Sequence, residues 1–140
     1  YSSYEQDILN TIEWLENTPA VDQPQKRKEA NTFLLKWTEG CPYITIELGK
    51  VLVPLLKNNS SQNIIIFFAG WIKYALTSKD YNNQIEGNNS GIEAVINFYS
   101  KNKKWIDKDK GVENYIKMQK KGTLKKYIEK IVTKESENKK

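Results

Sequence analysis

The sequence has 140 residues, the size of one ordinary domain, and 11% of them are aromatic, which is typical of a globular chain rather than a disordered one. It contains no histidine, so Ser-His-Asp catalysis, Cys-His catalysis and metal sites with a histidine ligand are excluded. No apolar run approaches the length of about 18 residues that a transmembrane helix requires.

Lysine dominates the 22 basic residues, which outnumber the 17 acidic ones, and Arg27 is the only arginine. The excess of lysine lies in the second half of the chain. Arginine offers the paired donors that read phosphate and guanine, whereas lysine acts as a point charge. This composition predicts loose attraction to acidic partners and argues against sequence-specific recognition of nucleic acid.

Apolar residues recur at three- and four-residue spacings from Tyr4 to Leu15, which predicts an amphipathic first helix. Pro19 is expected to end this helix, because the residue before a proline avoids the α-helical region. A second helix is expected to begin near Pro24, since proline suits the first helical turn, and to end at Gly40.

Residues 43–48 alternate between apolar and polar side chains, a period typical of a β-strand. A strand needs a partner for its backbone groups, and the only β-rich candidate is the segment 64–68. Pairing of these two segments is one interpretation. The alternative is an extended segment at 43–48 that leads into a short helix from Gly49 to Leu56, which Pro54 would shorten or bend.

Residues 62–76 are apolar on nearly every side of a helix, which predicts a buried central helix that is too short to cross a bilayer. Ser61 is a candidate cap for this helix, and Gly70 within it is expected to allow close packing of a neighbour. We therefore predict an all-α fold, a single compact domain of about five to seven helices around this central helix.

A further helix is predicted from Asn82 or Asn83 to about Lys103, because asparagine is a good N-cap residue. Ser90 offers an alternative start, since Glu93 three residues later would complete a capping box. The glycines inside this helix are expected to weaken it.

Asp109 is expected to open the next helix and Gly122 to end it, and Thr123 begins a last helix. The end of the chain, residues 134–140, contains no apolar residue and is predicted to be a disordered lysine-rich tail. The helical domain would then span residues 1–133.

Candidate nucleophiles are few. Ser100 and Lys103 match a Ser-x-x-Lys pair, but the further motifs that accompany such pairs in serine acyl enzymes are absent. Cys41, the only cysteine, has no histidine or basic cluster beside it in sequence. We expect it to be a small buried residue.

Acidic residues form two close pairs, Glu13 with Glu16 and Asp107 with Asp109, which we interpret as exposed solubilising groups. Catalysis by two carboxylates would require them to face each other across a cleft.

The stretch from Asp107 resembles a calcium loop but has Met118 where a bidentate glutamate belongs. No catalytic residue, metal ligand or cofactor is predicted, and an enzyme with acid–base carboxylates ranks third among the interpretations.

Residues 101–130 combine many lysines with interleaved aromatic residues, a pattern typical of weak binding to a phosphate backbone or another acidic polymer. The candidate contacts are Lys120, Lys121, Lys125 and Lys126. The competing interpretation is that these lysines only form the solvated faces of helices.

The four tryptophans divide into two groups. Trp37 and Trp71 lie on apolar helix faces and are expected in the core. Trp14 lies off the main stripe of its helix, and Trp105 lies in a polar loop. These two are the candidates for exposed aromatic residues in a binding platform.

Three stretches, residues 29–37, 70–76 and 91–99, together resemble a group of small uncharacterised exported helical proteins of Bacteroidetes-type bacteria. The resemblance covers most of the chain and implies export by a signal peptide to the periplasm or the outside of the cell. Such processing would explain why the sequence starts at Tyr1 without a methionine, although a trimmed expression sequence would do so too. The resemblance carries over no activity, ligand or catalytic residue.

The sequence favours a non-enzymatic, exported, soluble interaction or ligand-binding protein, with a protein or an acidic polymer as its partner. The alternative is a lysine-rich polyanion-binding module that uses residues 101–130. A cytoplasmic location is the alternative to export.

Overall fold

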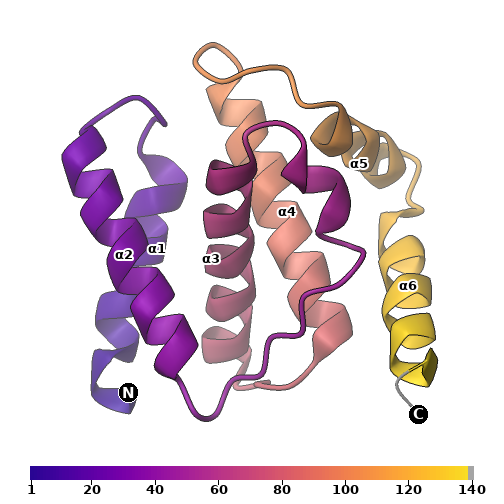
Figure 1. The fold of residues 1–140 in the computed structure, drawn as a ribbon, viewed down its shortest axis with the longest axis horizontal. Helices are drawn as coiled ribbons and strands as arrows, with labels where there is room; N and C mark the ends of the chain where they lie inside the picture. Colours follow the sequence, from indigo (N-terminus) through magenta and orange to yellow (C-terminus); the bar gives the residue numbers. More distant parts are fainter. Residues whose placement is uncertain (139–140) are drawn as a thin grey trace.

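The computed structural model describes residues 1–138, which form six α-helices and no β-strand (Figure 1). In chain order the elements are η1 (Ser2–Tyr4), α1 (Glu5–Asn17), α2 (Pro24–Gly40), η2 (Val53–Leu56), α3 (Ser60–Ser78), α4 (Gln84–Asn102), α5 (Lys110–Lys120) and α6 (Leu124–Asn138). The helices α3 and α4 lie between the α1–α2 pair and the α5–α6 pair (Figure 1). The prediction of one compact all-α domain is confirmed, and no helix among the described residues could span a membrane.

The segment between α2 and α3 contains the residues for which strand pairing was one interpretation. Residues 43–48 belong to no strand, and residues 64–68 lie inside α3, so the strand interpretation is wrong. The amide of Thr45 donates to the carbonyl of Tyr81 at 3.2 Å, and the side chain of Gln84 donates to the carbonyl of Thr45 at 2.9 Å. Isolated contacts with the first residue of α4 and with the loop before it therefore replace a sheet.

The short helix expected from Gly49 to Leu56 is reduced to the 3-10 helix η2, Val53–Leu56. Pro54 lies in its first turn, where the missing amide hydrogen is tolerated. Leu55 is fully buried, whereas Val53 and Leu56 are more than 40% exposed. In Figure 1 this segment passes in front of α4, between α3 and the α5–α6 pair.

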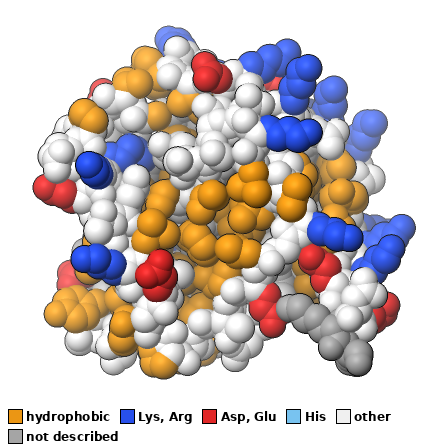
Figure 2. Space-filling view, in the orientation of Figure 1, with side chains coloured by type: hydrophobic (Ala, Val, Ile, Leu, Met, Phe, Trp, Pro, Cys, Tyr) orange, Lys and Arg blue, Asp and Glu red, His pale blue; other side chains and the backbone are white. Residues whose placement is uncertain are grey.

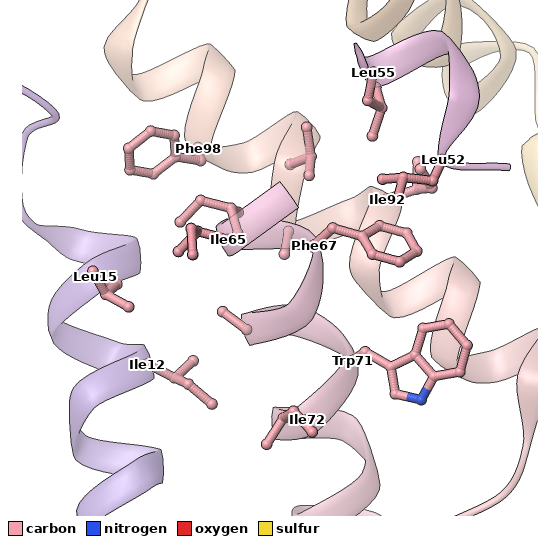
Figure 3. Close-up of a cluster of buried hydrophobic side chains, with 14 of the residues drawn as sticks. Ile12, Leu15, Leu52, Leu55, Ile65, Phe67, Trp71, Ile72, Ile92 and Phe98 are labelled. Carbon is pink, nitrogen blue, oxygen red and sulfur yellow. The ribbon is translucent and has the colours of Figure 1, made fainter. Parts of the chain in front are cut away.

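The central helix α3 is longer than predicted and begins one residue after Asn59, which adopts a left-handed conformation. Ser61 lies in its first turn and does not cap it. Side chains on two of its sides point to different neighbours: Phe67 and Trp71 point toward α4, and Ile72 points toward α1 (Figure 3). Its residues are mostly buried, so the prediction of a buried central helix is confirmed.

Close contact between α3 and α4 depends on glycines. A Cβ atom at Gly70 would lie 2.6 Å from the Cβ of Ala94 and 2.6 Å from the carbonyl oxygen of Ser90. A Cβ atom at Gly91 would lie 2.6 Å from the ring of Phe67. The expected role of Gly70 is therefore confirmed, and the glycines of α4 bring its backbone against the aromatic side chains of α3.

The N-terminus of α4 is capped by Asn83, whose side chain accepts a hydrogen bond from the amide of Glu86 at 3.0 Å. The helix therefore starts at the predicted asparagine pair, and the alternative start at Ser90 is wrong. Asp109 caps α5 as predicted, accepting from the amide of Val112 at 3.2 Å.

The last helix extends further than the sequence predicts. Residues 134–138, expected to be part of a disordered tail, form the end of α6, while residues 139–140 lie outside the described residues. The carboxylate of Glu135 accepts a hydrogen bond from the amide of Lys50 at 2.9 Å. This long-range contact fixes the end of α6 against the segment before α3, although the end of the helix has no apolar residue.

Candidate binding surface

The four lysines singled out from the sequence surround the turn between α5 and α6. Lys120 ends α5 and Lys121 follows it, while Lys125 and Lys126 lie in the first turn of α6. The turn passes through Gly122, whose φ of 73° is in the left-handed region that favours glycine. All four lysines are exposed, and Figure 2 shows basic side chains gathered along the side of the molecule formed by α5 and α6.

One of the four lysines is already engaged. The Nζ atom of Lys125 lies 2.6 Å from Oε1 of Glu86 in α4, and this hydrogen bond raises the pKa of Lys125. Among the described residues, Lys120, Lys121 and Lys126 form no ion pair. Three exposed ammonium groups therefore remain at the turn for an acidic partner.

Two acidic residues of the same region serve internal roles. Asp109 is fully buried, so its interpretation as an exposed solubilising group is wrong. It caps α5 and accepts a hydrogen bond from the side-chain amide of Asn63 at 2.9 Å. Glu113 accepts a hydrogen bond from the hydroxyl of Tyr99 at 2.6 Å, which lowers the pKa of Glu113. These carboxylates keep their negative charge, and Lys108, Lys103 and Lys117 also help to lower the pKa of Glu113, so part of the lysine charge in this region is compensated.

Three of the four tryptophans have the exposure that the sequence predicts, and Trp14 differs. Trp37 and Trp71 are buried and Trp105 is 46% exposed. Trp14 is only partly exposed, because the Nζ of Lys26 lies 4.9 Å and the Cζ of Arg27 lies 5.5 Å from its ring centroid. Trp14 therefore does not offer a free ring face, and the two candidate aromatic residues do not form a common platform.

The single arginine is structural. Arg27 is 5% exposed, and its Nη2 donates to the carbonyl oxygens of Leu15 at 3.1 Å and Thr18 at 2.7 Å, which satisfies the end of α1. Its guanidinium also lies 5.4 Å from the ring centroid of Phe98, and burial lowers the pKa of Arg27. Arg27 is not available to bind an external anion, so lysine provides the accessible positive charge.

The candidate catalytic groups do not converge. Cys41 is buried, Ser100 is exposed on α4, and the Nζ of Lys103 lies 5.6 Å from the ring centroid of Tyr99. Glu16 pairs with Lys73 at 3.3 Å. Within residues 1–138, no group of three or more Cys, Asp or Glu side chains is arranged to hold a metal ion.

Two cavities elsewhere on the molecule differ in the charge of the residues that line them. A cavity of about 420 Å³ between α1, α3 and α4 is lined by two glutamates and two lysines, so its charges balance. A cavity of about 510 Å³ lies where α6 meets the N-terminus of α4, and its charged lining residues are Glu47, Glu135 and Glu137. Neither cavity extends the lysine surface.

Comparison of the chain with protein-family models, with curated proteins and with solved structures found no match. Among the described residues, the exposed lysines at the α5–α6 turn are the feature that points most directly to a binding partner.

Proposed function

We propose that the protein is a non-enzymatic, exported, soluble binding protein that holds an acidic polymer through the lysines of α5 and α6. The observation that carries this proposal is the group of exposed lysines around the α5–α6 turn. Among the described residues, Lys120, Lys121 and Lys126 are exposed and form no ion pair. Such a surface attracts a chain of phosphate, sulfate or carboxylate groups.

The same surface implies limited selectivity. Its cations are lysines, which act as point charges on flexible stems, and the only arginine is buried. Binding of this kind depends on release of counterions and weakens as salt rises. We therefore expect affinity for many acidic polymers without discrimination between nucleotide sequences.

Heparin chromatography and fluorescence titration test the proposal. We expect the affinity for heparin to fall roughly ten- to hundred-fold between about 50 and 200 mM salt. A variant with Lys120→Glu, Lys121→Glu and Lys126→Glu should lose most of the binding that remains at about 50 mM. Lys125 is left unchanged, because its reversal would place a second carboxylate beside Glu86.

A matched control carries the same change of charge on other elements: Lys28→Glu, Lys36→Glu and Lys57→Glu, which are also exposed positions. The control should retain most of the affinity for heparin. Equal losses in the two variants would mean that only net charge matters, and the proposal of a site on α5 and α6 would be wrong.

Export is proposed on the resemblance of residues 29–37, 70–76 and 91–99 to exported bacterial proteins. The reading frame upstream of Tyr1 tests it. We expect about 15–30 residues with a basic start, an apolar stretch and a cleavage site of small residues. A frame that starts directly before Tyr1 would contradict export by this route.

A further inference from the structure

A cavity of about 340 Å³ lies between α6 and the segment that contains Lys50. It brings Lys50 together with side chains of α6, and its lining does not include the four lysines of the α5–α6 turn. The residues that line it are Lys50, Tyr127, Lys130, Ile131, Lys134, Glu135 and Asn138. Its size is in the range of small-molecule sites.

The backbone beside this cavity is held in place from two sides. The amide of Lys50 donates to Oε2 of Glu135 in α6 at 2.9 Å. The hydroxyl of the buried Tyr115 in α5 donates to the carbonyl of Val51 at 2.6 Å. The backbone that carries Lys50 is thus fixed to both α5 and α6, so a ligand would meet a largely preformed wall.

The cavity also has an apolar wall. Tyr127 is 39% exposed, and its ring lies 6.3 Å from the ring of Tyr115 beneath it. Ile131 packs against the core and is partly exposed. An aromatic ring or an acyl chain could cover these two side chains and remove apolar surface from water.

The charged groups at the cavity favour an anion. Among the described residues, Lys50, Lys130 and Lys134 form no ion pair, and Glu135, the acid in the lining, accepts from the backbone of Lys50. We propose that this cavity binds an organic anion in which a phosphate or carboxylate group is attached to an acyl chain or an aromatic ring. The site goes beyond the proposed binding of acidic polymers, which rests on Lys120, Lys121 and Lys126 rather than on Lys50, Lys130 and Lys134.

Calorimetric titration with octyl phosphate, kept below its micellar concentration, tests this inference. Inorganic phosphate and octylammonium are the matched probes, since one lacks the apolar part and the other reverses the charge. Octyl phosphate should bind at least about ten-fold more tightly than either probe. Equal affinity for octyl phosphate and inorganic phosphate, or tighter binding of octylammonium, would overturn the proposal.

Variants locate the site. Lys130→Glu combined with Lys134→Glu should weaken binding of octyl phosphate by about ten-fold or more, and Tyr127→Ser should also weaken it. The control, Lys120→Glu combined with Lys121→Glu, should weaken heparin binding while octyl phosphate binding stays unchanged. An unchanged affinity in the first variant, or equal losses in both, would overturn this site without deciding the fate of the polyanion proposal.

The same chemistry could be presented by a lipid headgroup or by a free amphiphile. Co-sedimentation with phosphatidylglycerol vesicles, with phosphatidylcholine vesicles as the reference, distinguishes these sources. Co-sedimentation that is lost in the Lys130→Glu, Lys134→Glu variant would support the site and identify a lipid. Binding of octyl phosphate without co-sedimentation would support the site and identify a free molecule.

Discussion

Trp71 has the largest side chain among those that are almost fully buried, and it is 1% exposed. Its ring lies 5.8 Å from the ring of Phe67 in an edge-on arrangement. A Cβ atom at Gly87 would lie only 2.1 Å from the indole ring of Trp71, which is too close for a real contact. Trp71 therefore fills a space that α4 leaves open by having glycine at this point.

Truncation of this side chain tests its contribution to the core. Trp71→Ala should lower the free energy of unfolding by about 3–5 kcal/mol, because it removes buried apolar surface and leaves a cavity. Trp105→Ala, at a side chain that is 46% exposed, should change it by no more than about 1 kcal/mol. Urea denaturation monitored by circular dichroism measures both values. A larger loss for Trp105→Ala would mean that Trp71 does not lie in the core.

Between elements, glycine has two opposite effects on stability at the α3–α4 contact: it lowers helix propensity, and it allows the two helices to pack closely. Glycine inside a helix costs about 1 kcal/mol relative to alanine. At Gly70, however, a Cβ atom would lie 2.6 Å from the backbone oxygen of Ser90, which cannot move unless α4 moves. Close packing of the two helices therefore outweighs helix propensity at this position.

Gly70→Ala should destabilise the protein by about 1–3 kcal/mol, the usual cost of overpacking, despite the gain in helix propensity. Ser100→Ala, at an exposed position of α4, is the control and should be neutral or slightly stabilising. Thermal unfolding of the two variants measures the difference. A Gly70→Ala variant more stable than the wild type would show that α3 and α4 are not in such close contact.

At the scale of the whole molecule, tyrosine hydroxyls connect elements that are distant in sequence. Tyr43 donates to Glu5 at 2.6 Å, and Tyr115 donates to the carbonyl of Val51 at 2.6 Å. Burial is the main cause that raises the pKa of Tyr115, and burial followed by the bond to Glu5 raises the pKa of Tyr43. The segment between α2 and α3 is therefore held on both sides by hydroxyl groups that must stay protonated.

These shifts predict a loss of stability at alkaline pH. Tyrosine in an unfolded chain has a pKa of about 10, whereas the hydrogen bond to Asp80 raises the pKa of Tyr74 to about 12. A pKa that is higher in the folded state gives stability that is complete below about pH 10 and is lost as the pH rises through the folded value. The free energy of unfolding should therefore fall between about pH 10 and pH 12.

Urea denaturation at several alkaline pH values measures this slope. Tyr115→Phe should make the slope shallower, since one buried hydroxyl no longer ionises on unfolding. Tyr4→Phe, at a side chain that is 54% exposed, is the control and should leave the slope unchanged. Stability that stays constant up to about pH 12 would contradict the prediction.

Features that depend on neighbouring residues can be predicted from the amino-acid sequence. Helix starts at Asn83 and Asp109 follow from side chains that bond amides within the same turn. Burial of α3 follows from its apolar composition on nearly every side, and the lysines of the α5–α6 turn are close together because they are close in the chain.

Features that depend on contacts between distant residues could not be predicted, because they form only when the helices pack. Residues 43–48 have a strand-like pattern, yet their partners are Tyr81 and Gln84 rather than another strand. Arg27 is buried at the end of α1, and Lys50 joins the lysines of α6 around one cavity. Periodicity and capping describe local geometry, whereas these placements arise when the packed helices bring the remaining polar groups within hydrogen-bonding distance.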